Sequence, residues 1–275
     1  MTTMSPIRGG VLHLPRTHEG RYSQSLERGL AILRAFTPER PWMGIAEMAE
    51  TLQMSRPTTH RYASTLVALN YLEQGPGRKY RLGMRAGDPG RSAVGSTTLR
   101  KLPHRFLADL RDRSACTASI AVLDGADVVY IDRARSAWQG QSEVASRLGR
   151  GSRLPAIDTA MGRMLLAQLS EIEQREAIDA SASRGAAVER GAAKDKLLEE
   201  LKRVGERGVA IADQVRIKGQ MCVAAPIRSR SAMTIAAVDV AAPKAGFSRA
   251  QARERLGPLV TESAAQISTH LGFTP

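Results

Sequence analysis

A cluster of hydrogen-bonding side chains lies in the stretch "SRPTTHR", residues 55–61. Serine and threonine hydroxyls can bond phosphates or base edges, and arginine can bind a phosphate or take the O6 and N7 atoms of guanine with two bonds. Further along, "GPGRKYRLG" gathers basic residues around a turn, where they suit contacts with a phosphate backbone. These two stretches predict a nucleic-acid-binding surface. Its candidate residues are Ser55, Arg56, Thr58, Thr59, His60, Arg61, Arg78, Lys79 and Arg81.

Two helices are expected before this cluster. In "SLERGLAILRAF" the apolar residues recur at helical spacing and form one face, with Ser25 as N-cap. The expected inward residues of this helix are Leu26, Leu30, Leu33 and Phe36. "TPERP" ends the helix, and "GIAEMAETL" follows as a second, shorter helix. Its expected inward residues are Ile45, Met48, Ala49 and Leu52.

The cluster itself is expected at the start of a third helix. Ser55 is its predicted N-cap, and Pro57 lies in the first turn, where a missing N–H is harmless. Tyr62, Leu66 and Leu69 are predicted to form the buried face, which leaves the hydroxyl and basic residues exposed. "YLEQ" and "RKYRLG" then flank "GPG" as two short strands around a turn.

This order of elements is that of a winged helix-turn-helix, in which the second helix of the pair enters the major groove of DNA. Any one arginine here fits a solvated surface as well as a phosphate contact, and His60 fits packing better than base reading. The capped helix start and the basic wing together favour DNA binding. Gln53 stands at the turn between the helices, where the backbone is tight and left-handed geometry costs energy without glycine.

Composition divides the chain in the same way. Its 275 residues suit two domains, and the 43% apolar content allows real cores. The net charge of +13 indicates an acidic polymer as partner. Residues 1–103 hold 15 basic and 7 acidic residues, so this smaller part carries most of the excess. Residues 1–20 are predicted to be a disordered basic tail, 21–86 the DNA-binding domain, 87–103 a linker and 104–275 a second domain.

The second domain mixes helices and strands. "ASIAVLDGADVVYIDRA" is predicted to be a hairpin turning at Asp124-Gly125. "SRLPAIDTAMGRMLLAQL" is predicted to pass from a loop into a helix capped by Asp158 or Thr159. Further helices are expected in "PHRFLADLRDRS", "LSEIEQREAI", "AKDKLLEELKRVGERG" and the last 25 or so residues, and strands in "GVAIAD", "MCVAAPI" and "MTIAAVDVAA". The fold class is α+β with a largely antiparallel sheet. A helix within residues 92–102 is also possible.

Seven segments together resemble the isocitrate lyase regulator (IclR) family of bacterial transcription factors. They are "SLERGLAILRAF", "IAEMAETLQMSRPTTHRYASTLVALNYLE", "YRLG", "IAVLDGADVVYIDR", "SRLPAIDTAMGRMLLA", "GVAIADQ" and "VAAPI", in family order over about residues 21–271. The resemblance implies a winged helix-turn-helix, a helical linker that dimerises and a GAF-like α/β effector domain. It implies a homodimer or dimer of dimers that represses or activates from a palindromic double-stranded DNA operator under control of a small-molecule effector, often a carboxylate. The hairpin and "GSRLPA…TAMGR" look closest to regulators of aromatic-acid catabolism.

The resemblance also implies where an effector binds. A helix N-terminus such as that of "DTAMGR" offers free N–H groups to a carboxylate. In relatives the segments matching this helix start, the stretch around residue 220 and alternate residues of the last strand line the pocket. The effector-binding candidates are Leu154, Ala160, Met161, Asp213, Gln220, Cys222, Asp239 and Ala241.

Asp239 departs from the family pattern, because relatives carry small hydroxyl or amide residues at this position and at Ala241. An acidic side chain there repels a carboxylate unless it is protonated or paired. Three interpretations stay open: the effector presents a donor such as an amide or amine, Asp239 pairs with an arginine, or Asp239 faces water at a strand end. Asp213 is either a pocket wall or a turn residue.

Other classes of protein are disfavoured. The sequence holds no Gly-x-Ser-x-Gly, Walker A, Gly-x-Gly-x-x-Gly or His-x-x-His motif, and its histidines lie outside residues 110–265, so no enzyme, metal or cofactor is predicted. Aromatic content of 4% argues against a single-strand binder built on stacking. Cys116 and Cys222 fit buried packing in a reduced, cytoplasmic protein. No apolar run reaches the ~18 residues of a membrane span.

Overall fold

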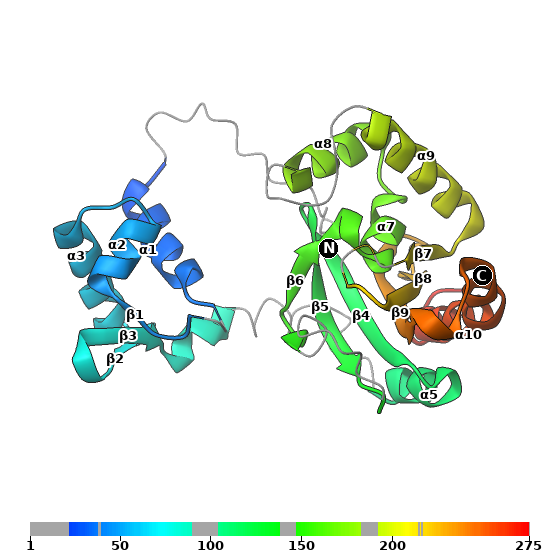
Figure 1. Ribbon diagram of the computed structural model, residues 1–275, viewed down its shortest axis with the longest axis horizontal. Coiled ribbons are helices and arrows are strands. Elements are labelled where there is room, and N and C mark those ends of the chain that lie inside the picture. Colours follow the sequence, from blue (N-terminus) through cyan, green and yellow to red (C-terminus); the bar gives the residue numbers. More distant parts are fainter. Residues whose placement is uncertain are drawn as a thin grey trace, which may run out of the picture. The chain divides into compact units, whose positions relative to one another are not determined.

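The computed structural model describes residues 22–37, 40–89, 104–137, 147–182, 192–213, 215 and 217–274. These residues divide into two compact units, one within residues 13–97 and the other within 98–275, which are described separately below (Figure 1). The helix considered for residues 92–102 and most of the predicted linker lie outside the described residues. None of the helices in the described part of the chain combines the length and apolar composition that a membrane crossing needs.

The N-terminal unit is a three-helix cluster with a small sheet. Its elements are α1 (Gln24–Ala35), β1 (Met43–Gly44), α2 (Ile45–Thr51), α3 (Arg56–Ala68), β2 (Leu72–Gln74), η1 (Pro76–Arg78), β3 (Lys79–Leu82) and η2 (Met84–Gly87). The strands pair antiparallel in the order β1-β3-β2. This confirms the predicted winged helix-turn-helix, including two strands around the "GPG" turn, where Gly77 adopts a positive φ of 69°.

The helix starts follow from capping chemistry. Ser55 accepts a hydrogen bond from the Thr58 backbone N–H, and Pro57 lies in the first turn of α3, as predicted. Helix α1 begins earlier than expected, because Ser23 rather than Ser25 is its N-cap. Gln53 adopts a φ of 50°, so the tight left-handed turn expected between α2 and α3 is confirmed.

The two predicted apolar faces of α1 and α3 are correct only in part. Phe36 is buried, and Leu33, Tyr62 and Leu66 pack against the core as predicted, but three other residues do not. Leu26 and Leu30 of α1 are exposed, while Ile32, Ala35 and Phe36 carry its packing into the core. Leu69 at the end of α3 is also exposed, and Ala63 takes the central buried position of this helix. The core of the unit is completed by side chains from α2 and the sheet, namely Met43, Met48, Leu72 and Tyr80.

The C-terminal unit is built on a six-stranded antiparallel sheet in the order β6-β5-β4-β9-β8-β7 (Figure 1). Its strands are β4 (Thr117–Asp124), β5 (Asp127–Ala134), β6 (Arg153–Pro155), β7 (Ala210–Asp213), β8 (Gln220–Arg228) and β9 (Thr234–Pro243). The β4–β5 hairpin turns at Gly125, whose φ is 61°, as "LDGADV" predicted. The predicted α+β class with an antiparallel sheet is confirmed.

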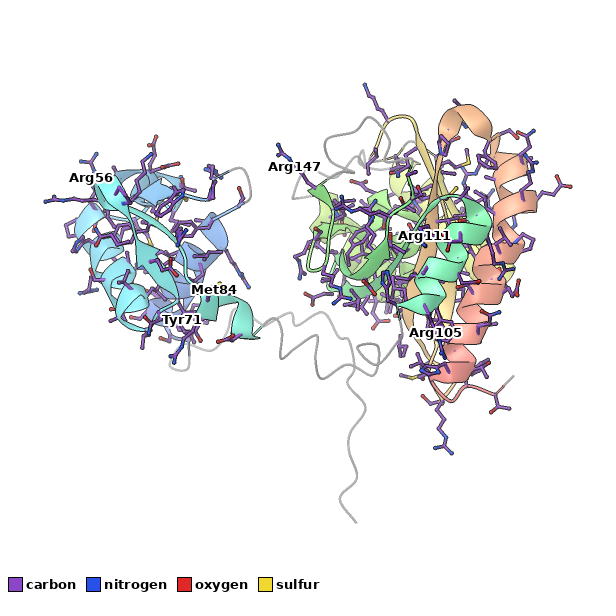
Figure 2. The ribbon with its side chains drawn as sticks, turned by 90° about the horizontal axis from the view of Figure 1, so that it is seen from below. Arg56, Tyr71, Met84, Arg105, Arg111 and Arg147 are labelled. Carbon is purple, nitrogen blue, oxygen red and sulfur yellow. The ribbon has the colours of Figure 1, made fainter. Side chains whose placement is uncertain are left out.

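Helices cover both faces of this sheet. Helix α7 (Ala160–Leu166) packs on one face, with α8 (Glu171–Ala182) and α9 (Ala192–Arg207) contributing to the same core. Helices α5 (Arg105–Ser114) and α10 (Arg249–His270) pack together on the opposite face (Figures 1 and 2). Ser248 begins α10 with a capping box to Gln251. The face under α7 is the one on which a cavity opens.

Candidate DNA-binding surface and effector pocket

The start of α3 forms an exposed polar and basic surface. Ser55, Arg56, His60 and Arg61 are exposed, and Figure 2 shows Arg56 pointing away from the unit. Thr58 is half-buried and hydrogen-bonds the Ser55 hydroxyl at 2.8 Å between the oxygens. Most of the predicted reading residues therefore lie together at one end of the helix.

Thr59 does not belong to this surface. Its side chain is fully buried, and its hydroxyl donates to the Ser55 carbonyl over 3.0 Å. The prediction that Thr59 is exposed at the start of α3 is wrong, because the helical rotation turns this position towards the core between the exposed residues 56 and 60. Ser64, one turn after His60, is exposed on the same side and was missed, although the four-residue spacing could have indicated it.

The wing carries three exposed cations with different surroundings. Arg78 adopts a positive φ of 56° at the tip, and Lys79 follows it at the start of β3. Arg81 is already engaged: its guanidinium lies 2.6 Å from Glu73 Oε2 and stacks 5.1 Å from the Trp42 ring centre. Arg78 and Lys79 are thus better placed than Arg81 for a new phosphate contact.

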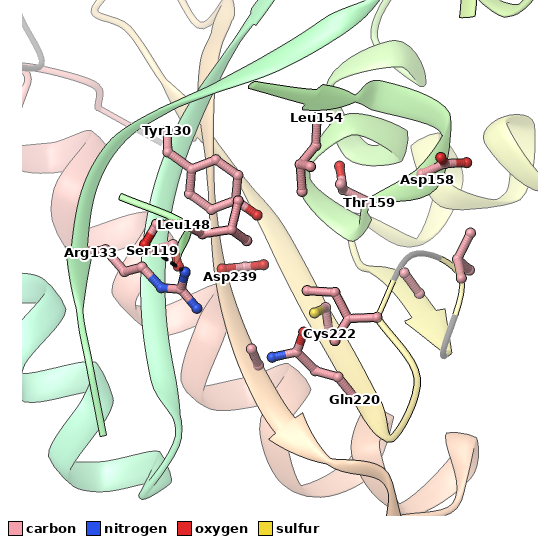
Figure 3. Close-up of a pocket in the computed structure, with 14 residues that line it drawn as sticks. Ser119, Tyr130, Arg133, Leu148, Leu154, Asp158, Thr159, Gln220, Cys222 and Asp239 are labelled. Atoms are coloured by element: carbon pink, nitrogen blue, oxygen red, sulfur yellow. Dashed lines mark hydrogen bonds between the residues drawn. The ribbon is translucent and has the colours of Figure 1, made fainter. Parts of the chain in front are cut away.

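A second site lies in the C-terminal unit, where a small cavity lies between the sheet and the turn before α7 (Figure 3). Five of the eight predicted effector residues line it. They are Leu154, Gln220, Cys222, Asp239 and Ala241. The cavity is also lined by residues that were not among the effector-binding candidates, although Asp158 and Thr159 belong to the helix start that was expected to hold a carboxylate. They are Ser119, Tyr130, Arg133, Leu148, Asp158, Thr159, Ala212, Val215 and Ile217.

Three predicted effector residues lie elsewhere. Ala160 and Met161 begin α7 but are fully buried in the core beneath the sheet. Asp213 ends β7, where its Oδ2 lies 2.7 Å from Lys244 Nζ. The lining of the cavity next to α7 comes instead from Asp158 and Thr159, just before the helix.

The turn before α7 is held firmly. Thr159 is the N-cap, as one of the two predicted alternatives, and accepts a hydrogen bond of 2.9 Å from the Gly162 N–H. Gly162 packs so closely on this turn that an added Cβ would lie 2.1 Å from the Ala156 carbonyl oxygen. Arg163 donates to the Ile157 carbonyl and pairs with Glu200 of α9 at 3.0 Å. Thr159 is therefore fixed in place at the cavity wall.

A β-bulge sets the composition of the opposite wall. The pairing of β4 with β5 shifts between Ile120 and Ala121, so Ser119 pairs with Arg133 and Ala121 with Tyr130. Residues three apart in a regular strand face opposite sides of a sheet, but the extra residue lets Tyr130 and Arg133 share one face. This irregularity explains why alternation alone could not indicate both residues.

Asp239 is buried in the middle of β9 with 3% of its surface exposed, which excludes the interpretation that it faces water at a strand end. Burial raises its pKa to about 7, while the nearby Arg133 charge and hydrogen bonds from Ser119 lower it. Burial and the Asp239 charge also raise the pKa of Tyr130 and of Cys222 well above the ordinary values, so both remain neutral. The cavity lining thus combines one cation, Arg133, two acidic residues, Asp158 and Asp239, and several other polar groups.

Known proteins share both units of this chain. The pattern described as the IclR helix-turn-helix domain matches residues 25–76, and that described as bacterial transcriptional regulator IclR C-terminal matches residues 91–269. The HTH-type transcriptional regulator XynR of Escherichia coli is 31% identical over 79% of this chain and 85% of its own.

Solved structures agree. A transcriptional regulator from Rhodococcus covers 91% of this chain and 98% of its own at 31% identity and a TM-score of 0.70. An IclR homologue from Microbacterium hydrocarbonoxydans, solved with 4-hydroxybenzoate, covers 90% of this chain and 98% of its own at 22% identity and a TM-score of 0.73. With matches over both units, the chain belongs to the IclR family of bacterial transcriptional regulators, which pair a DNA-binding helix-turn-helix with a C-terminal effector domain.

Proposed function

We propose that this regulator binds a palindromic operator as a homodimer or a dimer of dimers, with the start of α3 in the major groove and the wing on the phosphate backbone. The observation that carries the proposal is the exposed group formed by Ser55, Arg56, His60 and Arg61 at the capped end of α3. Helix-turn-helix proteins present this end of the second helix to base edges. Arg78 and Lys79 of the wing supply positive charge for neighbouring phosphates.

The dimer part of the proposal is supported by α1. Leu26 and Leu30 lie one helical turn apart, with 64% and 46% of their surfaces exposed, and Tyr22 just before the helix is 59% exposed. Such an apolar stripe on a small unit is typical of a protein contact surface. We assign it to a second copy of the chain, since a palindromic operator needs two reading heads related by a two-fold axis.

The effector part of the proposal places a small metabolite in the cavity beside Thr159, Arg133 and Asp239. An aromatic acid is one candidate effector. The Microbacterium homologue was solved with 4-hydroxybenzoate, and Arg133 places a positive charge in the cavity lining, where it can attract a carboxylate. Effector binding is proposed to change the affinity for DNA in a cytoplasmic protein. Residues 87–103 are proposed to link the two functions.

A gel-shift experiment tests the DNA-binding proposal. The labelled probe is a duplex that carries the region upstream of the protein's own gene, challenged with unlabelled duplex or with either single strand. We expect a shifted band that only the duplex competitor removes, and that weakens steeply with salt because several phosphates are neutralised. Equal competition by single strands would favour nonspecific nucleic-acid binding instead.

A further inference from the structure

Asp239 occupies a central position among charged and polar groups of the cavity. It pairs with Ser119 of β4, and Ser119 in turn pairs with Arg133 of β5. The three residues therefore form one row across neighbouring strands, with the Cα atoms of Asp239 and Arg133 about 9 to 10 Å apart, or two strand spacings. All three line the cavity (Figure 3).

The Asp239 carboxylate lacks a hydrogen bond on one side. Ser119 lies close enough to lower the pKa of Asp239, but the buried Oδ1 atom accepts no hydrogen bond from any residue that the structure describes. A buried carboxylate oxygen without a donor costs folding free energy, because its hydrogen bonds to water are lost and not replaced. A side chain held at this cost inside a cavity is complementary to a ligand that brings the missing donor.

We infer that Asp239 determines effector specificity: it selects a small molecule that donates a hydrogen bond through an ammonium, amide or hydroxyl group, and rejects one that places a carboxylate there. The inference rests on the proposed function, because it takes this cavity as the effector site. An acidic group of the same molecule is assigned to the Arg133 side of the row. The donor and the acid thus lie at opposite ends of the effector.

The neighbouring side chains fit this division. Tyr130, Cys222 and Gln220 line the cavity near Asp239 as neutral groups, and the other acidic residue of the lining, Asp158, lies beside Thr159 in the turn before α7 (Figure 3). The charge of the nearby Arg133 favours the ionised form of Asp239. A cationic or neutral donor between them gains from the carboxylate, while a second carboxylate meets repulsion in a site of low dielectric constant.

Two sets of size-matched probes test the inference by isothermal titration calorimetry at pH 8. The aromatic set is 4-(aminomethyl)benzoate, 4-(hydroxymethyl)benzoate and 4-(carboxymethyl)benzoate, and the aliphatic set is 4-aminobutanoate, 4-hydroxybutanoate and glutarate. In each set two members carry a donor opposite the acid and the third is a diacid. The full-length protein is compared with Asp239→Asn and Asp239→Ser. Asp179→Asn is the control, because Asp179 pairs with Lys194 on the surface of α8.

The expected result is that a donor-bearing member of at least one set binds about tenfold or more tightly than its diacid, the factor that one charge-assisted hydrogen bond supplies. Asp239→Asn and Asp239→Ser should remove most of this preference while circular dichroism shows an intact fold, and Asp179→Asn should keep it. The inference is overturned if the diacids bind as well as the donors, if no probe binds, or if the preference survives in both Asp239 variants. The same preparations are also tested for binding to duplex DNA. Loss of DNA binding counts against the proposed function, whereas loss of the donor preference counts against the role of Asp239.

Discussion

Ser119 of β4 lies directly opposite Asp239 of β9, a residue that lines the cavity and whose buried Oδ1 atom has no hydrogen-bond donor among the described residues. The Ser119–Asp239 pairing connects the β-bulge next to Ser119 with the buried carboxyl group of Asp239. The bulge in β4 and β5 brings Arg133 into the same row, and the burial of the row raises the pKa of Asp239. The proposed effector site therefore contains a buried carboxyl group whose pKa is raised to about 7.

The raised pKa of Asp239 predicts a pH dependence of stability. Its folded value of about 7 lies above the ordinary 3.8, so the folded state holds the proton more tightly than the unfolded state. This stabilisation is complete below pH ~3.8 and is lost as pH rises through about 7, by at most ~4 kcal/mol for a shift of roughly three units. The melting temperature of the wild type should fall between pH 5 and pH 8.

The variant Asp239→Asn isolates this effect, because the amide does not titrate. Its melting temperature should fall less over the same pH range, and it should exceed that of the wild type most at pH 8. The pKa values of Tyr130 and Cys222 are raised well above their ordinary values, so both side chains stay neutral over this pH range and add no titration of their own. If the melting temperatures of the two proteins fall by the same amount from pH 5 to pH 8, Asp239 is already ionised at pH 5 and the prediction is wrong.

Arg56 should contribute to operator affinity without contributing to the fold. It is exposed at the start of α3, and loss of a base or phosphate contact by an arginine commonly costs ~1–3 kcal/mol of binding free energy. Fluorescence anisotropy with a labelled operator duplex should show Arg56→Ala weakened while its melting temperature is unchanged. Arg203→Ala on the exposed surface of α9 is the control and should bind normally. A destabilised Arg56→Ala would contradict the assignment of this face.

Gln53 stores a small amount of backbone strain. Its φ of 50° at the turn between α2 and α3 favours glycine, so Gln53→Gly should raise the free energy of unfolding by about 0.5–1 kcal/mol. Urea unfolding followed by circular dichroism measures the change. Gln24→Gly in the first turn of α1 should have the opposite sign, since glycine weakens a helix. A destabilised Gln53→Gly would mean that the side chain makes a contact worth more than the strain.

The exposed leucines of α1 should support the dimer. Replacing both Leu26 and Leu30 by glutamate removes two apolar side chains and adds like charges, so the dimer dissociation constant should rise roughly tenfold or more. Sedimentation velocity measures it, and Ile172→Glu, an exposed apolar residue of α8, is the control. Unchanged association in the double variant would place the dimer contact elsewhere.

Sequence patterns predicted where helices, strands and turns lie better than they predicted which side of each helix is buried. Ser55, Pro57 and the Asp124-Gly125 turn are local signals, and each lies where it was expected. The inward face of α1 was right for Leu33 and Phe36 but wrong for Leu26 and Leu30, because the packing of three helices, and not the leucine spacing, selects Ile32 and Ala35 for the core. A hydroxyl at residue 59 looks like a DNA contact in sequence but satisfies a buried carbonyl in the fold.

The cavity was only partly predictable for a physical reason. Alternation along β9 indicated Asp239 and Ala241, which share a face with Ser119 through regular pairing. Arg133 and Tyr130 depend on the bulge, and a bulge changes the facing of every later residue in its strand. Thr159 was indicated only as a helix cap, although the same position lines the cavity.

Selection from a pool of randomised DNA duplexes tests the central claim most directly. The full-length protein is used to enrich bound duplexes over several rounds, and the products are sequenced. Binding by two α3 helices predicts an inverted repeat whose half-sites lie about 10 bp apart, or a multiple of that distance, and Arg56→Ala should weaken or relax the preference within each half-site. Absence of any enriched sequence, or enrichment that Arg56→Ala leaves intact, would contradict the account.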